Sequence, residues 1–209
     1  MDGIVDERAY IRAMSRVFNR VVMAFAEASA SPNPNLEVDA VTADPEHLAE
    51  HAREVALALL NSEQGGLQSI ARFYRRRSGY VTELVVDQPF DDSARGIALA
   101  AGFGLIVSQA RIDGYFVCAE AWIAVAGLDP AVDALALEDR MDRQEVVVVS
   151  AATPQAHIIR VYAIERDGSS VSLADSPSRL PLRLNVPALA NLYEAPWNET
   201  LQSREMAEG

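Results

Sequence analysis

The sequence predicts an α+β fold in which helices pack on an antiparallel sheet. Two observations predict it. Apolar residues recur at three- and four-residue spacing over residues 6–28, as on one face of a helix. Residues 115–175 instead hold β-rich runs separated by turn residues, and Asp-Gly at 167–168 is a strong hairpin signal. Helices followed by strands favour α+β over a doubly wound parallel sheet. We therefore expect one domain over residues 1–175.

Four helices are expected, at about 6–28, 45–60, 67–77 and 94–111. The apolar stripe of the first consists of Tyr10, Met14, Val17, Phe18, Val21 and Phe25. Asp44 suits the N-cap of the second helix, because Pro45 then takes the first helical position. Ser78-Gly79 ends the third helix, and residues 80–86 are rich enough in β-formers to be extended.

The fourth helix carries three glycines, Gly96, Gly102 and Gly104. Each costs roughly 1 kcal/mol relative to alanine in a helix interior. Three of them therefore indicate that this helix packs closely on a sheet or on a partner helix.

Four strands are expected in the antiparallel meander, at about 115–125, 144–152, 156–166 and 170–175. Val146–Val149 shows no apolar–polar alternation, which predicts a central strand buried on both faces. Pro154 suits the turn before the next strand. Residues 176–209 contain four prolines, so we expect an irregular tail with at most a turn of helix at 188–194.

Composition excludes several function classes. The chain has 209 residues, 50% of them hydrophobic, and a net charge of −12, which opposes binding to nucleic-acid phosphates. All 18 basic residues are arginine, so a lysine-containing phosphate loop and a Schiff-base lysine are absent. One cysteine excludes an intramolecular disulfide framework. The sequence indicates no cofactor and no membrane span, and a cytoplasmic location is expected, or a virion if the gene belongs to a phage.

Polar side chains cluster in the meander, where core residues are expected. Alternation places Cys118, Glu120 and Trp122 on one face of the first strand, and Arg160 and Tyr162 together on one face of the third. We expect a cross-strand pair between Glu120 and Arg160. The candidate groove formed by this polar seam comprises Glu120, Trp122, Arg143, Glu145 and Arg160. The alternative is that the seam only fixes strand register.

Two arginine clusters are candidate partner-binding surfaces. The first winds along one face of the first helix, and the second interleaves with Phe73 and Tyr74. They comprise Arg8, Arg12, Arg16 and Arg20, and Arg72, Arg75, Arg76 and Arg77. Either cluster would suit an acidic partner, including the acidic face of a neighbouring subunit. The alternative is a solvated helix face with acidic partners in the same chain.

Two further patterns resemble catalytic sites. His47, Glu50 and His51 match the H-x-x-E-H pattern of inverted zinc peptidases, with two histidines on one helical face and a glutamate as general base. The resemblance covers five residues, and an exposed helix start is the alternative. Cys118 and His157 are a candidate nucleophile and base, although a cysteine inside a strand is typically an inert core residue.

Three short motifs resemble a loose group of uncharacterised bacterial and bacteriophage proteins. They are Glu120-Ala121-Trp122, Asp142-Arg143-Gln144-Glu145-Val146 and Ile164-x-Arg166-Asp167-Gly168. The resemblance spans residues 115–168 and implies the same meander and a bacterial or phage origin. It carries no known activity.

From the sequence, the expected function is that of a non-catalytic interaction or structural protein that self-associates. Its partner would be a second copy or a protein with an acidic surface. The alternative is a hydrolase, either metal-dependent at His47, Glu50 and His51 or carboxylate-based near Glu120 and Glu145.

Overall fold

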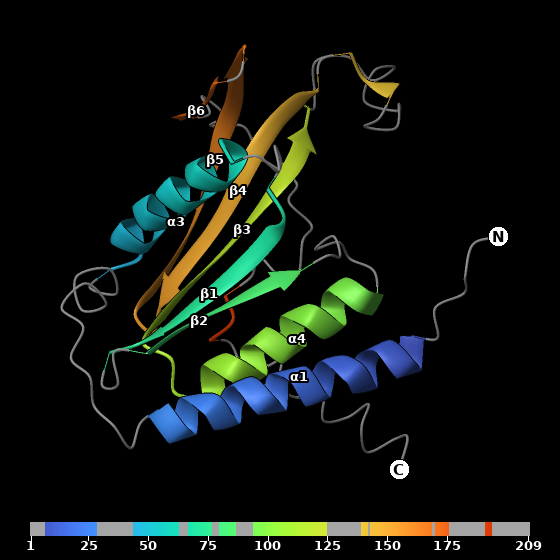
Figure 1. Ribbon diagram of the computed structural model, residues 1–209, viewed down its shortest axis with the longest axis vertical. Coiled ribbons are helices and arrows are strands. Elements are labelled where there is room, and N and C mark those ends of the chain that lie inside the picture. The colour runs from blue at the N-terminus through green and yellow to red at the C-terminus, as the bar shows by residue number, and fades with distance from the viewer. Residues whose placement is uncertain are drawn as a thin grey trace.

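The computed structural model describes residues 7–28, 44–62, 67–76, 80–86, 94–124, 139–141, 143–168, 170–175 and 191–193. Within them lie three helices and one six-stranded antiparallel sheet, which confirms the α+β fold (Figure 1). The helices are α1 (Glu7–Ala28), α3 (Pro45–Leu60) and α4 (Ala94–Gln109). The strands are β1 (Ser69–Arg75), β2 (Tyr80–Val86), β3 (Gly114–Ile123), β4 (Gln144–Thr153), β5 (Ala156–Asp167) and β6 (Ser170–Asp175).

The strands follow the order β2-β1-β3-β4-β5-β6. The predicted meander β3–β6 is therefore confirmed, and β4 lies inside the sheet with Val146–Val149 buried. Pro154 lies in the turn between β4 and β5, and Gly168 adopts a φ of +60° where β5 turns into β6. Glycine tolerates this left-handed conformation without steric cost.

The predicted helix over residues 67–77 is wrong, because this segment forms strand β1. It pairs with β2 on one side and with β3 on the other. Alternate side chains are buried against the two faces, Ile70 and Tyr74 on one and Ala71 and Phe73 on the other. Leu67, Ile70, Ala71 and Tyr74 also fall at helical spacing, and the ladders on both sides decide in favour of a strand.

The helices cover opposite faces of the sheet (Figure 1). Helix α3 packs on the face that presents Phe116, Cys118, Val147, Val149 and Tyr162. Helices α1 and α4 lie against the other face. Their core comprises Phe18, Leu99, Phe103 and Ile106 from the helices and Ala71, Phe73, Tyr115 and Val117 from the sheet.

The close helix packing that the glycines predicted occurs between α1 and α4. The ring of Phe18 lies directly over Gly102, so close that a Cβ on Gly102 would be 1.8 Å from the Phe18 Cε2 atom. Phe18 also meets Phe103 edge-on, with ring centroids 5.5 Å apart. Val17, which its spacing placed on the apolar stripe of α1, is instead 37% exposed. The side chain of Phe25, also on that stripe, lies outside the described residues.

Only residues 191–193 of the predicted tail are described, and they dock on the core. Leu192 is buried, and its backbone N–H donates to the Tyr115 hydroxyl at 2.8 Å. The Tyr193 hydroxyl donates to the carbonyl of Ile112 at 3.2 Å. Among the helices of the described residues, none is long and apolar enough to cross a bilayer.

Candidate functional site

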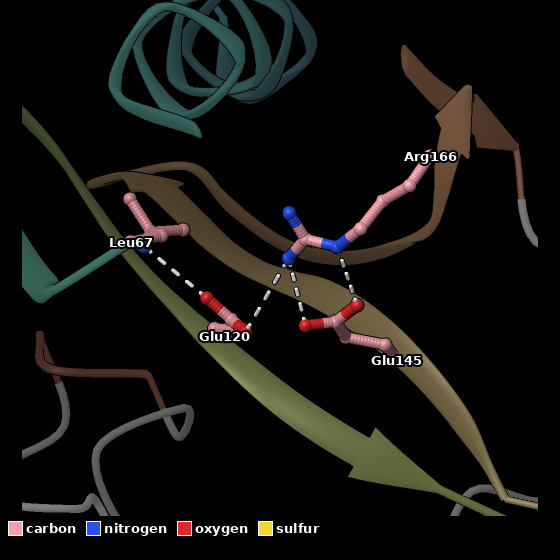
Figure 2. A network of polar contacts seen from close by, with 4 residues as sticks. All are labelled: Leu67, Glu120, Glu145 and Arg166. Atoms are coloured by element: carbon pink, nitrogen blue, oxygen red, sulfur yellow. Dashed lines mark hydrogen bonds and ion pairs between the residues drawn. The ribbon is translucent and has the colours of Figure 1, made fainter. Parts of the chain in front are cut away.

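The polar seam lies on the sheet face that α3 covers, just past the end of that helix. Helix α3 ends at Asn61, whose side-chain amide accepts from the Val171 N–H at 3.0 Å and donates to the Val171 carbonyl at 3.1 Å. This pair of bonds fixes the helix end to the edge strand β6. The sheet beyond it carries Glu120 from β3, Glu145 from β4 and Arg166 from β5, which point toward one another (Figure 2).

Arg166 holds Glu145 through two hydrogen bonds. Its Nε donates to Glu145 Oε2 at 3.0 Å and its Nη2 donates to Glu145 Oε1 at 2.9 Å, the bidentate geometry of a strong arginine–carboxylate pair. The same Nη2 lies 4.0 Å from Glu120 Oε1. Glu120 Oε2 accepts the backbone N–H of Leu67 at 3.1 Å, so the segment that enters β1 closes the cluster (Figure 2).

The two carboxylates have pKa values shifted in opposite directions. Partial burial raises the pKa of Glu120, and hydrogen bonding to Glu145 raises it further. Hydrogen bonding from Arg166, followed by that from Glu120, lowers the pKa of Glu145. Of the two carboxyls, Glu120 therefore binds a proton more readily than Glu145.

Trp122 extends the seam toward solvent. It is directly opposite Glu145 in the β3–β4 ladder and 47% exposed. The Arg143 guanidinium lies 4.8 Å from the centroid of its ring, a cation–π contact worth about 0.5–1 kcal/mol at an exposed site. The structure therefore brings together Glu120, Trp122, Arg143 and Glu145 from the predicted groove.

Arg160, the fifth predicted groove residue, lies elsewhere, and the expected Glu120–Arg160 pair is wrong. Arg160 is opposite Val149 in the β4–β5 ladder and forms an ion pair with Glu46 at the start of α3. The cation of the seam is Arg166, which the groove prediction omitted. The sequence did contain a signal for this. A tight turn at Pro154 pairs Thr153 with Ala156, and counting back along both strands places Arg160 opposite Val149, four residues from Glu145.

The two histidines of α3 have different surroundings. His47 is exposed and its backbone N–H is capped by Asp44 Oδ1 at 3.0 Å. The ring of His51 faces the sheet, 6.0 Å from the Phe116 ring, and its Nε2 lies 3.4 Å from Arg72 Nη1. A guanidinium beside that nitrogen disfavours a divalent cation there. In the part of the chain that the structure describes, no group of three metal-ligating side chains is found.

Cys118 and His157 do not form a nucleophile and base. The strand registers place Cys118 on the face under α3 and His157 on the opposite face. Cys118 is fully buried, and burial raises the pKa of its thiol to about 12. The His157 Nε2 atom lies 2.8 Å from the hydroxyl of Ser150. Ser150 is itself fully buried in the middle of β4 and closed to a substrate.

The two predicted arginine surfaces have different outcomes. On α1, Arg12, Arg16 and Arg20 are all exposed on the outer side of the helix, whereas the side chain of Arg8 lies outside the described residues. In the second cluster, Arg72 and Arg75 project from opposite faces of β1, so they form no common surface. Arg72 is bound to Glu83, Arg76 is exposed, and Arg77 lies outside the described residues.

A cavity of about 400 Å³ opens where four segments meet at one end of the sheet. It lies between the start of α3, the end of β1, the start of β3 and the β4–β5 turn. Its lining residues include Asp44, Arg76, Asp113, Thr153 and Gln155. The backbone N–H of Arg76 donates to Asp113 Oδ2 at 2.8 Å, which ties two of these segments together.

No family model, no curated protein and no solved structure matches the chain. The resemblance of residues 115–168 to bacterial and phage proteins accordingly stays a prediction.

Proposed function

We propose that this protein is a non-catalytic interaction protein that self-associates, and that the exposed side of α1 is its docking surface. We call this surface the arginine face and define it as Arg12, Arg16 and Arg20. The single observation that carries the proposal is that these cations are exposed and have no acidic partner among the described residues.

Other arginines of the described chain contrast with the arginine face. Arg53 lies 3.5 Å from Glu50, Arg72 binds Glu83, Arg160 binds Glu46, and Arg166 binds Glu145. Arg160 links β5 to α3, Arg72 and Arg166 each link two neighbouring strands, and Arg53 lies beside a carboxylate of its own helix. The three cations of the arginine face lie on the outermost helix of the molecule (Figure 1), where pairing can only come from another molecule or from residues outside the described ranges.

Charge identifies the preferred partner. Arginines four residues apart repel one another mildly along a helix, so their spacing is better tolerated opposite carboxylates than in isolation. A chain of net charge −12 supplies many carboxylates, and a second copy is present at the same concentration as the first. The same net charge opposes approach to nucleic acid, because phosphates are repelled by the rest of the surface.

Sedimentation velocity against salt tests the proposal. The wild-type chain should sediment as a species larger than its 22.7 kDa monomer at low ionic strength. It should dissociate near 1 M salt, where the Debye length falls to about 3 Å. A monomer at every salt concentration would contradict self-association.

A matched pair of variants isolates the arginine face. The first variant removes three positive charges as Arg12→Gln, Arg16→Gln and Arg20→Gln. The control adds three negative charges at exposed positions of other segments, as Ala58→Glu, Gln68→Glu and Gln155→Glu. Both change the net charge by −3, so a general charge effect would appear in both. Loss of association in the arginine variant alone supports the proposal. If the arginine variant still associates, the arginine face is not the docking surface.

One observation favours a hydrolase as a second candidate. The opposite pKa shifts of Glu120 and Glu145 are those of an acid beside an ionised carboxylate, and Trp122 offers an exposed ring next to them. Purified protein screened against chromogenic ester, phosphate and glycoside substrates should then show an activity that Glu120→Gln abolishes. A reaction that survives Glu120→Gln would not belong to this site.

A further inference from the structure

Resting on the self-association proposed above, we infer that the arginine face docks on the acidic tip of the β5–β6 hairpin of a second copy, so that copies join head to tail. We define the acidic tip as Glu165 and Asp167. Both side chains lie on one face of β5, two residues apart, at the end of the strand that leads into Gly168.

The acidic tip has no cation of its own among the described residues. Glu165 and Asp167 are both exposed. Their partners across the β5–β6 ladder are Ser172 and Ser170, and the Ser172 hydroxyl donates to Glu165 Oε2 at 3.3 Å. Small neutral partners leave the carboxylates uncompensated and leave room for long side chains to reach them.

The two surfaces match in spacing as well as in sign. Residues four apart on a helix are separated by about 6 Å along its axis. Residues two apart on a strand are separated by about 6.6 Å. Neighbouring arginines of the arginine face therefore meet the two carboxylates of the acidic tip nearly in register, and α1 offers three such arginines for two carboxylates.

The placement of the two surfaces limits how copies can join. Figure 1 shows α1 and the β5–β6 end of the sheet at opposite ends of the molecule. The arginine face paired with itself would bring like charges together, so the contact joins two unlike surfaces. Repeating this contact produces an open chain of copies or a closed assembly, of which an antiparallel pair is the smallest.

Neutral variants of the full chain test this contact. One variant carries Arg12→Gln, Arg16→Gln and Arg20→Gln, and retains the acidic tip. The other carries Glu165→Gln and Asp167→Asn, and retains the arginine face. Circular dichroism and thermal unfolding of each variant, compared with wild type, confirm that both are folded before mixing.

Each variant alone should be a monomer, and an equimolar mixture should form a 1:1 complex of about twice 22.7 kDa that grows no further. The complex stops there because each member retains only one of the two surfaces. If the Glu165→Gln/Asp167→Asn variant still associates while the arginine variant does not, the acceptor lies elsewhere and this inference fails, although the proposed function stands. If folded variants are each monomeric and do not combine, the inference also fails. A wild-type chain that is monomeric overturns both.

Discussion

Replacing Gly102 with alanine should destabilise the protein, although the helix propensities of the two residues predict the opposite. Alanine favours a helix interior over glycine by about 1 kcal/mol. Against this gain, the new methyl group would lie 1.8, 2.1 and 2.4 Å from three carbons of the Phe18 ring. Real carbon–carbon contacts are about 3.5–4.0 Å, so the ring or the whole of α1 must move by more than an ångström.

The ring has little freedom to move. Phe18 is 1% exposed and is held edge-on by Phe103 at 5.5 Å. Overpacking of a well-filled core costs about 1–3 kcal/mol, and a contact this close belongs at the upper end. After the propensity gain is subtracted, we expect a net loss of about 2 kcal/mol. In a chain of this size that loss lowers Tm by about 4–8 °C.

Urea unfolding followed by circular dichroism measures this loss, and a double-mutant cycle assigns it. Gly102→Ala made in a Phe18→Leu background should lose less stability than in the wild type, because the smaller side chain makes room for the methyl group. An increase in stability of Gly102→Ala in the wild-type background would refute the close contact between α1 and α4.

Three further predictions concern other parts of the fold. Glu120→Gln should leave stability at pH 7 unchanged or higher, whereas Glu145→Gln should lower it. Because the pKa of Glu120 is raised, ionising Glu120 costs stability as the pH rises through that pKa. Because the pKa of Glu145 is lowered, the ionised form of Glu145 contributes stability, which is lost as the pH falls through that pKa. Urea midpoints at pH 4 and pH 7 check both signs. Asp44→Ala removes the N-cap of α3 and should cost about 1 kcal/mol in chemical unfolding. Cys118, fully buried with a pKa raised to about 12, should react with a thiol reagent at pH 8 only as fast as the protein unfolds, so labelling that outpaces unfolding would contradict its burial.

The sequence predicted the fold where one local signal sufficed. The stripe of α1, the Asp44-Pro45 start of α3 and the turn at Gly168 each depend on residues close in the chain. Strand β1 was misassigned because its conformation depends on partners 5 to 17 residues away in β2 and 40 to 48 residues away in β3. The spacing of apolar residues within the seven residues of β1 does not reveal these partners.

In the candidate site too, local patterns were predicted correctly and contacts between distant segments were not. Alternation alone placed Glu120 and Trp122 on one face, which the register confirms. Which cation joins them depends on two alignments. The turn at Pro154 fixes how β5 aligns with β4, but β3 pairs with β4 across a long connection in which the sequence offers no turn signal. The exposure of Arg12, Arg16 and Arg20 followed from helical spacing, but their lack of acidic partners among the described residues required the positions of the strands.

Strand β3 couples the unfolding of the two helical layers. Its successive side chains enter the two hydrophobic cores in turn, Tyr115 and Val117 under α4 and Phe116 and Cys118 under α3. Neither helical layer can therefore detach without disturbing the strand on which the other layer rests. The protein should melt as one cooperative unit, in which a probe on α1 and a probe on α3 report the same transition.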